Sequence, residues 1–345
     1  MVLIEYRKFY KEEIIMSHFT VLVIGENVEK QLAPFQENNM GDCPEEFLSF
    51  VDTEDEHLEE YETESSTRVV MPDGTLKYPW DEEFRKPNSI GIGGNTHEVP
   101  AHLEQKEIPF RELYSTFEEY MSDYCEIKSR DEKHNRYGHY KNPNAKWDWY
   151  QVGGRWTGFF KVKDGISCVV GKPGVFGRQP EPGYSDVCLK KYVDIEGMRK
   201  DYSEKANKLY DDLESATEGI EKPEWKSFKE LCEKYPADKD IAEVRKEYWD
   251  NPFVVAASKS NDYFQWIDDD KEMFMTREEF VNRYCNRNIC TFAVVKDGKW
   301  YERGEMGWWA CVSNEKDDAA WGEEWNKLFA DLPDDTLLTI VDCHI

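Results

Sequence analysis

Two apolar strands, one near each end of the chain, constrain the fold more than any other feature. Ser17–Gly25 is apolar on both faces and stops at a glycine, a pattern that predicts a buried strand. Thr336–Ile345 predicts a final strand of similar character. A chain of 345 residues is long enough to bury a sizeable core around such strands, as one large domain or two ordinary ones.

The strongest elements between these strands predict an α+β fold. A helix opens at Pro109 with apolar residues three and four apart, and Asp297-Gly298 marks a hairpin. In chain order the elements are strand 17–25, helix 109–124, strand 148–162, strand 291–296, helix 318–332 and strand 336–345. This βαββαβ order is that of a ferredoxin-like fold. We therefore expect a ferredoxin-like antiparallel sheet in which the first and last strands are antiparallel neighbours.

A helical insertion is expected to divide that core. Residues 186–290 are rich in Lys and Glu, show helical periodicity and contain a capping box at Thr276–Glu279. The core then consists of residues 16–185 and 291–345. Within the first part, residues 42–64 hold eleven acids among 23 residues and no Lys or Arg. The apolar residues between these acids predict a docked, partly helical segment rather than a disordered one.

The composition indicates a cytoplasmic protein. No run of about 18 apolar residues is present, which excludes a membrane-spanning helix. The nine cysteines are scattered without a CxxC pair, as expected of reduced thiols in a cytosol. Residues 1–15 lack the pattern of a signal peptide. Met16 directly precedes the first strand, and the codons of Lys11-Glu12-Glu13 are compatible with a purine-rich ribosome-binding site. We therefore expect residues 1–15 to be a non-native extension.

The formal net charge of −27 argues against direct binding to a nucleic-acid backbone, which needs a footprint of Lys and Arg. Three interpretations of the charge remain. It can serve solubility alone, it can imitate the phosphates of DNA, or it can surround a local basic pocket. The charge by itself does not choose among them.

His18, Asp342 and His344 are candidate metal ligands. If the first and last strands pair in antiparallel fashion, His18 lies close to both other residues, and alternation places Asp342 and His344 on one face. Two imidazoles and a carboxylate suit a divalent ion such as zinc or manganese. The alternatives are polar strand ends in solvent, or a hydrogen-bonded His–Asp pair that closes the sheet.

The densest run of aromatic residues, 147–160, surrounds a Gly-Gly-Arg sequence and is the candidate ligand site. Its glycine amides and arginine suit a phosphate or carboxylate group, and its tryptophans suit stacking on a base. A core strand whose glycines make room for bulky neighbours is the alternative. A later loop adds an acid and a tryptophan. The residues expected to contact a ligand are Trp149, Tyr150, Gly153, Gly154, Arg155, Trp156, Glu305 and Trp308.

Three segments resemble a family of uncharacterised proteins encoded by tailed phages and some bacteria. They are Ser17–Gly25, the Trp-Asp-Trp-Tyr-x-x-Gly-Gly-Arg-Trp run at 147–156, and the terminal Val341-Asp342-Cys343-His344-Ile345. The resemblance covers most of the chain from Met16 onward. It implies a viral or mobile-element origin, a bacterial cytosol, and an accessory role such as host takeover or counter-defence. It carries no reaction and no catalytic residue.

These observations favour a phage accessory protein that recognises a small nucleotide or nucleotide-derived signal, by sequestration or by cleavage. If the protein is an enzyme, we expect a metal-dependent phosphodiesterase or hydrolase, although the sequence contains no Gly-x-Ser-x-Gly, HD or HExxH motif. The alternative is an acidic inhibitor or DNA mimic that covers a basic host protein through residues 42–64. Neither hypothesis calls for a membrane.

Overall fold

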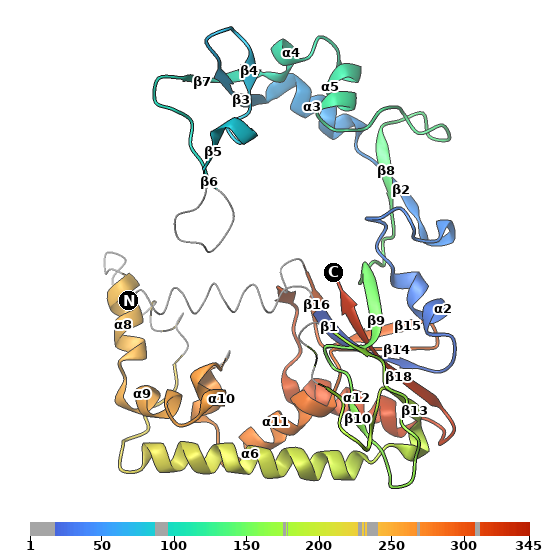
Figure 1. Ribbon diagram of the computed structural model, residues 1–345, viewed down its shortest axis with the longest axis vertical. Helices are drawn as coiled ribbons and strands as arrows, with labels where there is room; N and C mark the ends of the chain where they lie inside the picture. Colours follow the sequence, from blue (N-terminus) through green and yellow to red (C-terminus); the bar gives the residue numbers. More distant parts are fainter. Residues whose placement is uncertain are drawn as a thin grey trace. The chain divides into compact units, whose positions relative to one another are not determined.

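The computed structural model of the chain describes residues 18–86, 96–174, 177, 179–226, 230, 232, 241–267, 270–307 and 311–345 (Figure 1). They form two compact units, which we call the sheet unit (18–37 with 144–345) and the inserted unit (38–143). This division differs from the boundaries expected at 185 and 290. The predicted extension, residues 1–15, and the candidate ligand residue Trp308 lie outside the described residues. No helix in the described part of the chain is long and apolar enough to cross a membrane.

The sheet unit is built on a mixed sheet of seven strands. Six of them lie in the order β11-β9-β18-β1-β14-β15, and β13 also pairs with β18. Their bounds are β1 His18–Ile24, β9 Trp149–Gly154, β11 Lys172–Pro173, β13 Val187–Leu189, β14 Ala293–Lys296, β15 Lys299–Glu302 and β18 Leu337–His344. The predicted α+β class is confirmed, and so is the antiparallel pairing of β1 with β18.

A ferredoxin-like topology is not shown. In that topology the strand predicted at 148–162 would lie beside β14, but β9 pairs with β18 instead. The place beside β14 is taken by β15, because Asp297 and Gly298 both adopt left-handed backbone conformations and close a tight hairpin between these strands. The sheet is also mixed, since β1 and β14 are parallel.

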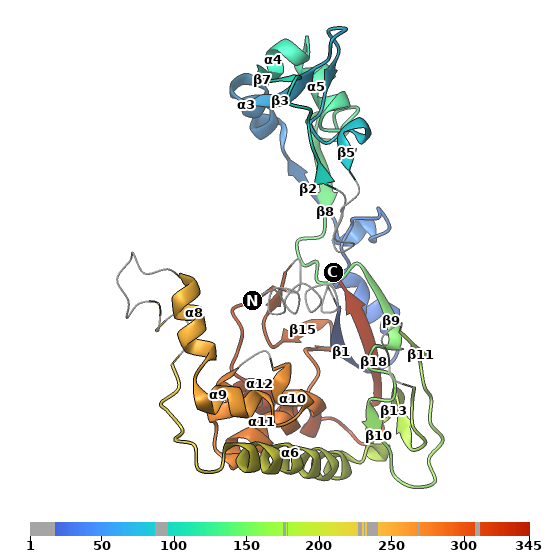
Figure 2. The same cartoon turned by 60° about the vertical axis from the view of Figure 1, so that its left-hand side comes forward.

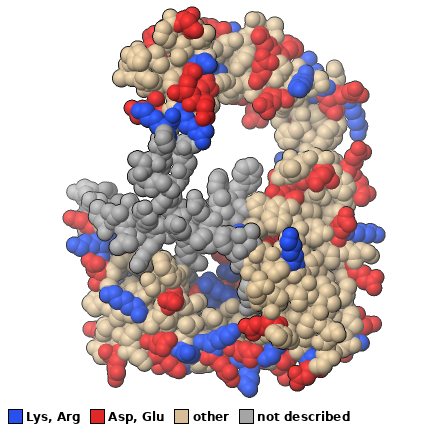
Figure 3. All heavy atoms as spheres, in the orientation of Figure 1, with Lys and Arg blue, Asp and Glu red and all other residues tan. Residues whose placement is uncertain are grey.

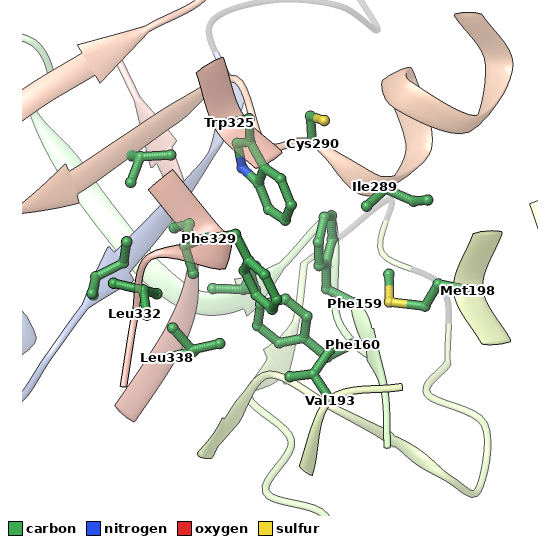
Figure 4. Packing of buried hydrophobic residues seen from close by; sticks show 14 of the residues in the cluster. Phe159, Phe160, Val193, Met198, Ile289, Cys290, Trp325, Phe329, Leu332 and Leu338 are labelled. Atoms are coloured by element: carbon green, nitrogen blue, oxygen red, sulfur yellow. The ribbon is translucent and has the colours of Figure 1, made fainter. Parts of the chain in front are cut away.

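Both faces of the sheet are covered, as the apolar pattern of the first strand predicts. Along β1, Leu22 and Ile24 enter one hydrophobic cluster, whereas Val21 and Val23 enter the cluster on the opposite face. The first cluster contains Phe159, Phe160 and the stacked rings of Trp325 and Phe329 (Figure 4). The second cluster is smaller and includes residues of α2 and of the turn that follows it.

Helices account for most of the region expected to be an insertion. The long helix α6 packs on α11, which in turn contacts α12, and α9 also packs on α6 (Figures 1 and 2). A third hydrophobic cluster joins α6, α9, α10 and α11. The helices of the sheet unit are α2 Val28–Leu32, α6 Ile195–Thr217, α8 Ile241–Trp249, α9 Pro252–Ser258, α10 Asp262–Gln265, α11 Arg277–Ile289 and α12 Asp318–Ala330. The predicted capping box opens α11. Short strand pairs complete the unit: β10 Phe160–Lys161 with β12 Tyr184–Ser185, and β16 Glu305–Met306 with β17 Val312–Ser313.

The inserted unit has its own small core of aromatic side chains around Phe110 and Tyr120. The helix predicted at 109–124 is two helices, because Thr116 caps a new helix by accepting a hydrogen bond from the amide of Glu119. The acidic segment forms β2 and α3, so the prediction of an ordered, partly helical segment is confirmed. The elements are β2 Ser49–Asp52, α3 Glu54–Thr63, β3 Ser65–Val70, β4 Leu76–Lys77, β5 Arg85–Lys86, β6 Thr96–His97, β7 Glu104–Pro109, α4 Phe110–Leu113, α5 Phe117–Asp123 and β8 Gly138–Lys141.

Candidate functional site

The candidate site lies where three antiparallel strands of the sheet unit meet, at the start of β1, the end of β18 and the start of β9. The strand register places His18 directly opposite His344, and His344 directly opposite Trp149. Residues directly opposite each other on neighbouring strands lie on the same face of a sheet. One histidine from each end of the chain and one tryptophan from β9 are therefore side by side.

His18 is held by a buried carboxylate. Its Nδ1 lies 2.7 Å from Oδ1 of Asp342, which precedes His344 by two residues on the same face of β18. Asp342 is 1% exposed, and its other oxygen accepts a hydrogen bond of 2.8 Å from the backbone amide of Arg155. The expectation that His18 lies close to Asp342 and His344 is confirmed. The carboxylate contacts the imidazole, which matches the alternative of a His–Asp pair that closes the sheet.

His344 is held in the same way by Asp148. The Nδ1 atom of His344 lies 2.7 Å from Oδ1 of Asp148, and the same oxygen accepts a hydrogen bond from the backbone amide of Trp149. The amide of Asp148 in turn donates to the carbonyl of His344 at 2.9 Å. Asp148 was not among the site residues predicted from the sequence. Its position next to Trp149, the residue opposite His344, would have revealed it once the pairing of β9 with β18 was known.

The three rings form one aromatic group. The centroids of His18 and His344 are 5.1 Å apart, with the ring planes at 76°. Trp149 stacks on His344 at 5.4 Å and 16°, and it meets His18 edge-on at 5.1 Å. Trp149 is 43% exposed, whereas the side chain of His18 is 13% exposed and that of His344 29%. The site thus combines two partly covered imidazoles with one open aromatic face.

The hydrogen bonds determine which imidazole nitrogen is available. A neutral imidazole that donates from Nδ1 to a carboxylate carries a lone pair on Nε2. Neither His18 nor His344 makes a hydrogen bond from Nε2 to another described residue. Burial lowers the pKa of His18, and this outweighs the opposite effect of the Asp342 carboxylate; the charge of Arg155 lowers it further. His18 is therefore neutral near pH 7, and its Nε2 can act as a base or as a metal ligand.

The site offers a metal ion the imidazoles of His18 and His344, and each imidazole is hydrogen-bonded through Nδ1 to a carboxylate. No three His, Cys, Asp or Glu side chains within the described ranges are arranged to hold a metal ion. Asp342, expected as a third ligand, is instead the hydrogen-bond partner of His18. A carboxylate behind each imidazole is the usual outer arrangement of metal-binding histidines. Zinc or manganese bound by His18 and His344 stays a prediction.

The Gly153-Gly154 pair makes room for buried carboxylates. Both glycines have left-handed backbone conformations, with φ of +77° and +56°. A Cβ atom on Gly154 would lie 2.3 Å from Oδ2 of Asp342, and one on Gly153 would lie 2.7 Å from Oδ2 of Asp186. Asp186 is fully buried and accepts hydrogen bonds from the amides of Gly158, Phe159 and Gly171. Protein carboxylates thus occupy the positions beside this turn at which a ligand phosphate was expected.

The other predicted ligand residues do not all gather at the histidines. Arg155 does lie near them: burial lowers its pKa, and the Asp342 carboxylate opposes that shift. Tyr150 lies opposite Cys343 and packs in the second hydrophobic cluster, on the other face of the sheet from His344. Trp156 packs against the first cluster, and Glu305 lies on the short strand β16. Among the predicted ligand residues, the structure brings Trp149 and Arg155 to the histidine pair.

Comparisons with known protein families, with curated proteins and with solved structures found no match to this chain.

Proposed function

We propose that the sheet unit binds a small nucleotide or nucleotide-derived signal and cleaves it by acid–base chemistry at His18 and His344. The observation that carries this proposal is the pair of neighbouring imidazoles, each with Nδ1 held at 2.7 Å from a carboxylate. The end of a strand can fold without two adjacent His–Asp hydrogen bonds. Carboxylates that fix the tautomer and orientation of histidines are typical of acid–base sites and of metal sites.

The pair can divide the two proton transfers of phosphodiester hydrolysis. His18, kept neutral by burial, accepts the proton of an attacking water whose oxygen forms the new bond to phosphorus. His344, when protonated, donates its proton to the leaving oxygen as the old bond from phosphorus breaks. Proton transfer by a positioned side chain contributes roughly 10²–10⁴-fold to a rate. In the metal-dependent version, His18 and His344 would hold a zinc or manganese ion, which lowers the pKa of a bound water.

The surroundings of the pair favour a planar, anionic ligand. Trp149 is exposed and stacked on His344, so its open face can stack on a base. The positive charge of Arg155 acts on His18 and favours an anionic ligand in the same place. The counter-defence role in the cytosol of a bacterial host is part of this proposal and rests on the resemblance expected from the sequence. Sequestration without cleavage uses the same contacts but needs no proton transfer.

A ligand panel tests this proposal. The full chain is incubated with cyclic oligonucleotides and NAD-derived signals, in EDTA, in Mn²⁺ and in Zn²⁺, and products are separated before and after heat denaturation. We expect a new product, and a loss of at least 100-fold in its rate of formation in His18→Gln and in His344→Gln. His139→Gln, on the exposed strand β8, is the matched control. Turnover in EDTA supports the acid–base version, and turnover only with added metal supports the metal version.

Other results of the panel are equally informative. Ligand that disappears and returns intact on heating indicates sequestration. If every compound passes through unchanged and unbound, the nucleotide proposal is wrong. If a product forms equally fast in the two histidine variants, the cleavage does not occur at this pair.

An acidic inhibitor remains the second candidate, because α3 buries none of its residues and exposes Glu56 and Glu59. Part of the acidic segment is neutralised internally, since Arg136 pairs with Asp52 and Asp55, and Arg130 with Glu54. Acidic side chains are also scattered among Lys and Arg on the face in Figure 3 rather than gathered there in one patch. This candidate predicts salt-sensitive capture of a basic host protein.

Neutralising exposed acids tests the second candidate. We expect capture to be lost in the variant Glu46→Gln, Glu56→Gln, Glu59→Gln and kept in the control Glu218→Gln, Glu221→Gln, Glu323→Gln, whose changes also lie at exposed positions. Equal capture by both triple variants would exclude recognition through residues 42–64.

A further inference from the structure

Among the residues that the structure describes, the inserted unit buries one guanidinium that has no carboxylate partner. Arg68 on β3 is 5% exposed, and no Asp or Glu among the described residues lies within 4.0 Å of its nitrogens. The other arginines that the structure describes in this unit all have an acidic partner: Arg85 pairs with Glu82, Arg111 with Glu62, Arg130 with Glu54 and Arg136 with Asp52. The most buried of these cations is thus the one left without an anion.

The position of the Arg68 side chain is fixed by polar and aromatic contacts. Its Nη1 donates to Oγ of Ser66 and, at 3.3 Å, to the carbonyl of Thr67. Its Cζ lies 3.7 Å from the centroid of the Tyr78 ring, which stacks in turn on Trp80 at 4.8 Å and 27°. Trp80 is 58% exposed. The row Arg68–Tyr78–Trp80 therefore runs from a buried charge to an open aromatic surface.

Phenol hydroxyl groups lie beside the same guanidinium. The hydroxyl of Tyr114 is close to both Arg68 and the hydroxyl of Tyr78. Burial, with a contribution from Tyr78, raises the pKa of Tyr114 to about 12, so this phenol stays protonated at neutral pH and can donate a hydrogen bond. The bonds from Arg68 to Ser66 and Thr67 both leave from Nη1, and Tyr114 contacts the same guanidinium.

An unpaired buried charge is costly. Removing a guanidinium from water without an anionic partner costs several kcal/mol even after the protein relaxes. The chain carries 71 Asp and Glu against 44 Lys and Arg, so acids were abundant as partners. The contact between Arg68 and the Tyr78 ring offsets only part of this desolvation penalty, since a cation–π contact contributes about 0.5–2 kcal/mol. An anionic group of a ligand would offset the rest of the desolvation penalty of Arg68.

We propose that Arg68, Tyr78 and Tyr114 form a binding site for an oxyanion of the size of phosphate, carried by a ligand whose planar part lies against Trp80. Arginine suits this role better than lysine because its planar fork presents several donors in a fixed geometry. The site belongs to the inserted unit and needs neither histidine of the sheet unit. The oxyanion site can therefore be confirmed or overturned independently of the proposed cleavage at His18 and His344.

Titration of the full chain with three probes tests the site. Inorganic phosphate, phenyl phosphate and benzoate are titrated by calorimetry at an ionic strength held constant with chloride, because weak electrostatic binding is screened by salt. We expect phosphate to bind and phenyl phosphate to bind at least several-fold more tightly. That preference should be lost in Trp80→Ala. Tighter binding of benzoate than of either phosphate would overturn the choice of a phosphate-sized oxyanion.

Variants locate the binding. We expect Arg68→Lys to weaken phosphate binding at least 10-fold and Arg85→Lys, at an exposed arginine of the same unit, to leave it unchanged. Because Arg68→Lys can disturb packing, the double variant Tyr78→Phe, Tyr114→Phe keeps the rings and removes only the hydroxyls. It should weaken binding several-fold with an unchanged circular dichroism spectrum. Equal phosphate affinity in wild type, Arg68→Lys and the double variant, or no binding at 10 mM of any probe by the wild type, would overturn the proposal.

Discussion

At the scale of single residues, the site depends on two carboxylates that the ring positions alone would not reveal. An oxygen of Asp342 lies 2.7 Å from Nδ1 of His18, and an oxygen of Asp148 lies 2.7 Å from Nδ1 of His344. Each carboxylate also accepts a hydrogen bond from a backbone amide, that of Arg155 for Asp342 and that of Trp149 for Asp148. The backbone bonds fix the carboxylates, and the carboxylates fix the rings. Nε2 of each ring is therefore the atom on which the proposed chemistry depends.

The lowered pKa of His18 predicts how folding stability depends on pH. The folded protein keeps His18 neutral in a range where the unfolded chain, with a pKa of about 6.5, takes up a proton. The contribution is therefore fully present above the unfolded pKa and is lost as pH falls from about 6.5 toward the lower folded pKa. We expect the free energy of unfolding in urea to fall more between pH 8 and pH 5 for the wild type than for His18→Gln.

His139→Gln serves as the control for this comparison, because His139 lies on the exposed strand β8 and should leave the wild-type pH dependence unchanged. An equal or larger loss of stability in His18→Gln would show that His18 is not held neutral by the fold.

At the scale of elements, the Gly153-Gly154 pair at the end of β9 leaves room for the Asp342 carboxylate of the site. A side chain at Gly154 would collide with Asp342 and would also sit at φ +56°, which disfavours any residue but glycine. We expect Gly154→Ala to lower the free energy of unfolding by about 2–4 kcal/mol. Gly165→Ala, at φ +79° with nothing within 4 Å of its Cβ position, should cost only about 1 kcal/mol. If urea denaturation shows that Gly154→Ala and Gly165→Ala lower the free energy of unfolding by similar amounts, Asp342 does not pack against this turn.

Pairing of β1 with β18 could be predicted from the sequence, and the partner of β9 could not. Alternation along a strand is local, so His18, Asp342 and His344 follow from the two end strands once these are neighbours. The position of a strand in the sheet depends on contacts between distant segments, which local periodicity does not encode. For this reason the sequence predicted a ferredoxin-like order that the structure does not show, and the role of Asp148 was missed. Likewise, the apolar spacing of 109–124 predicted a helix but not its interruption at Thr116.

At the scale of the whole molecule, the inserted unit leaves and rejoins the sheet unit at neighbouring backbone positions. Gln36 bridges to Trp147, and the amide of Glu37 donates to the carbonyl of Trp147 at 2.7 Å. The acidic composition of 42–64 marked this region in the sequence, but the extent of the unit, 38–143, depends on packing that composition does not reveal.

This arrangement predicts that the sheet unit folds without the inserted unit. A chain in which a short Gly-Ser linker joins residue 37 to residue 144 should keep one cooperative thermal transition, with a midpoint within a few degrees of that of the same unit in the full chain. Near-ultraviolet circular dichroism, which reports the packing of Trp321 and Trp325, follows the transition. Loss of cooperativity would show that the sheet unit needs residues 38–143 to fold.

The most direct test of the central claim is a long-range ¹H–¹⁵N spectrum of the full chain labelled with ¹⁵N-histidine, with signals assigned through His18→Gln and His344→Gln. At pH 8 we predict that both histidines carry a proton on Nδ1, that Nε2 of His18 is unprotonated, and that a nucleotide found in the ligand panel shifts both Nε2 signals together. An Nδ1 without a proton in either histidine, a proton on Nε2 of His18, or a bound nucleotide that moves neither signal would contradict the account of His18 and His344 as one acid–base site.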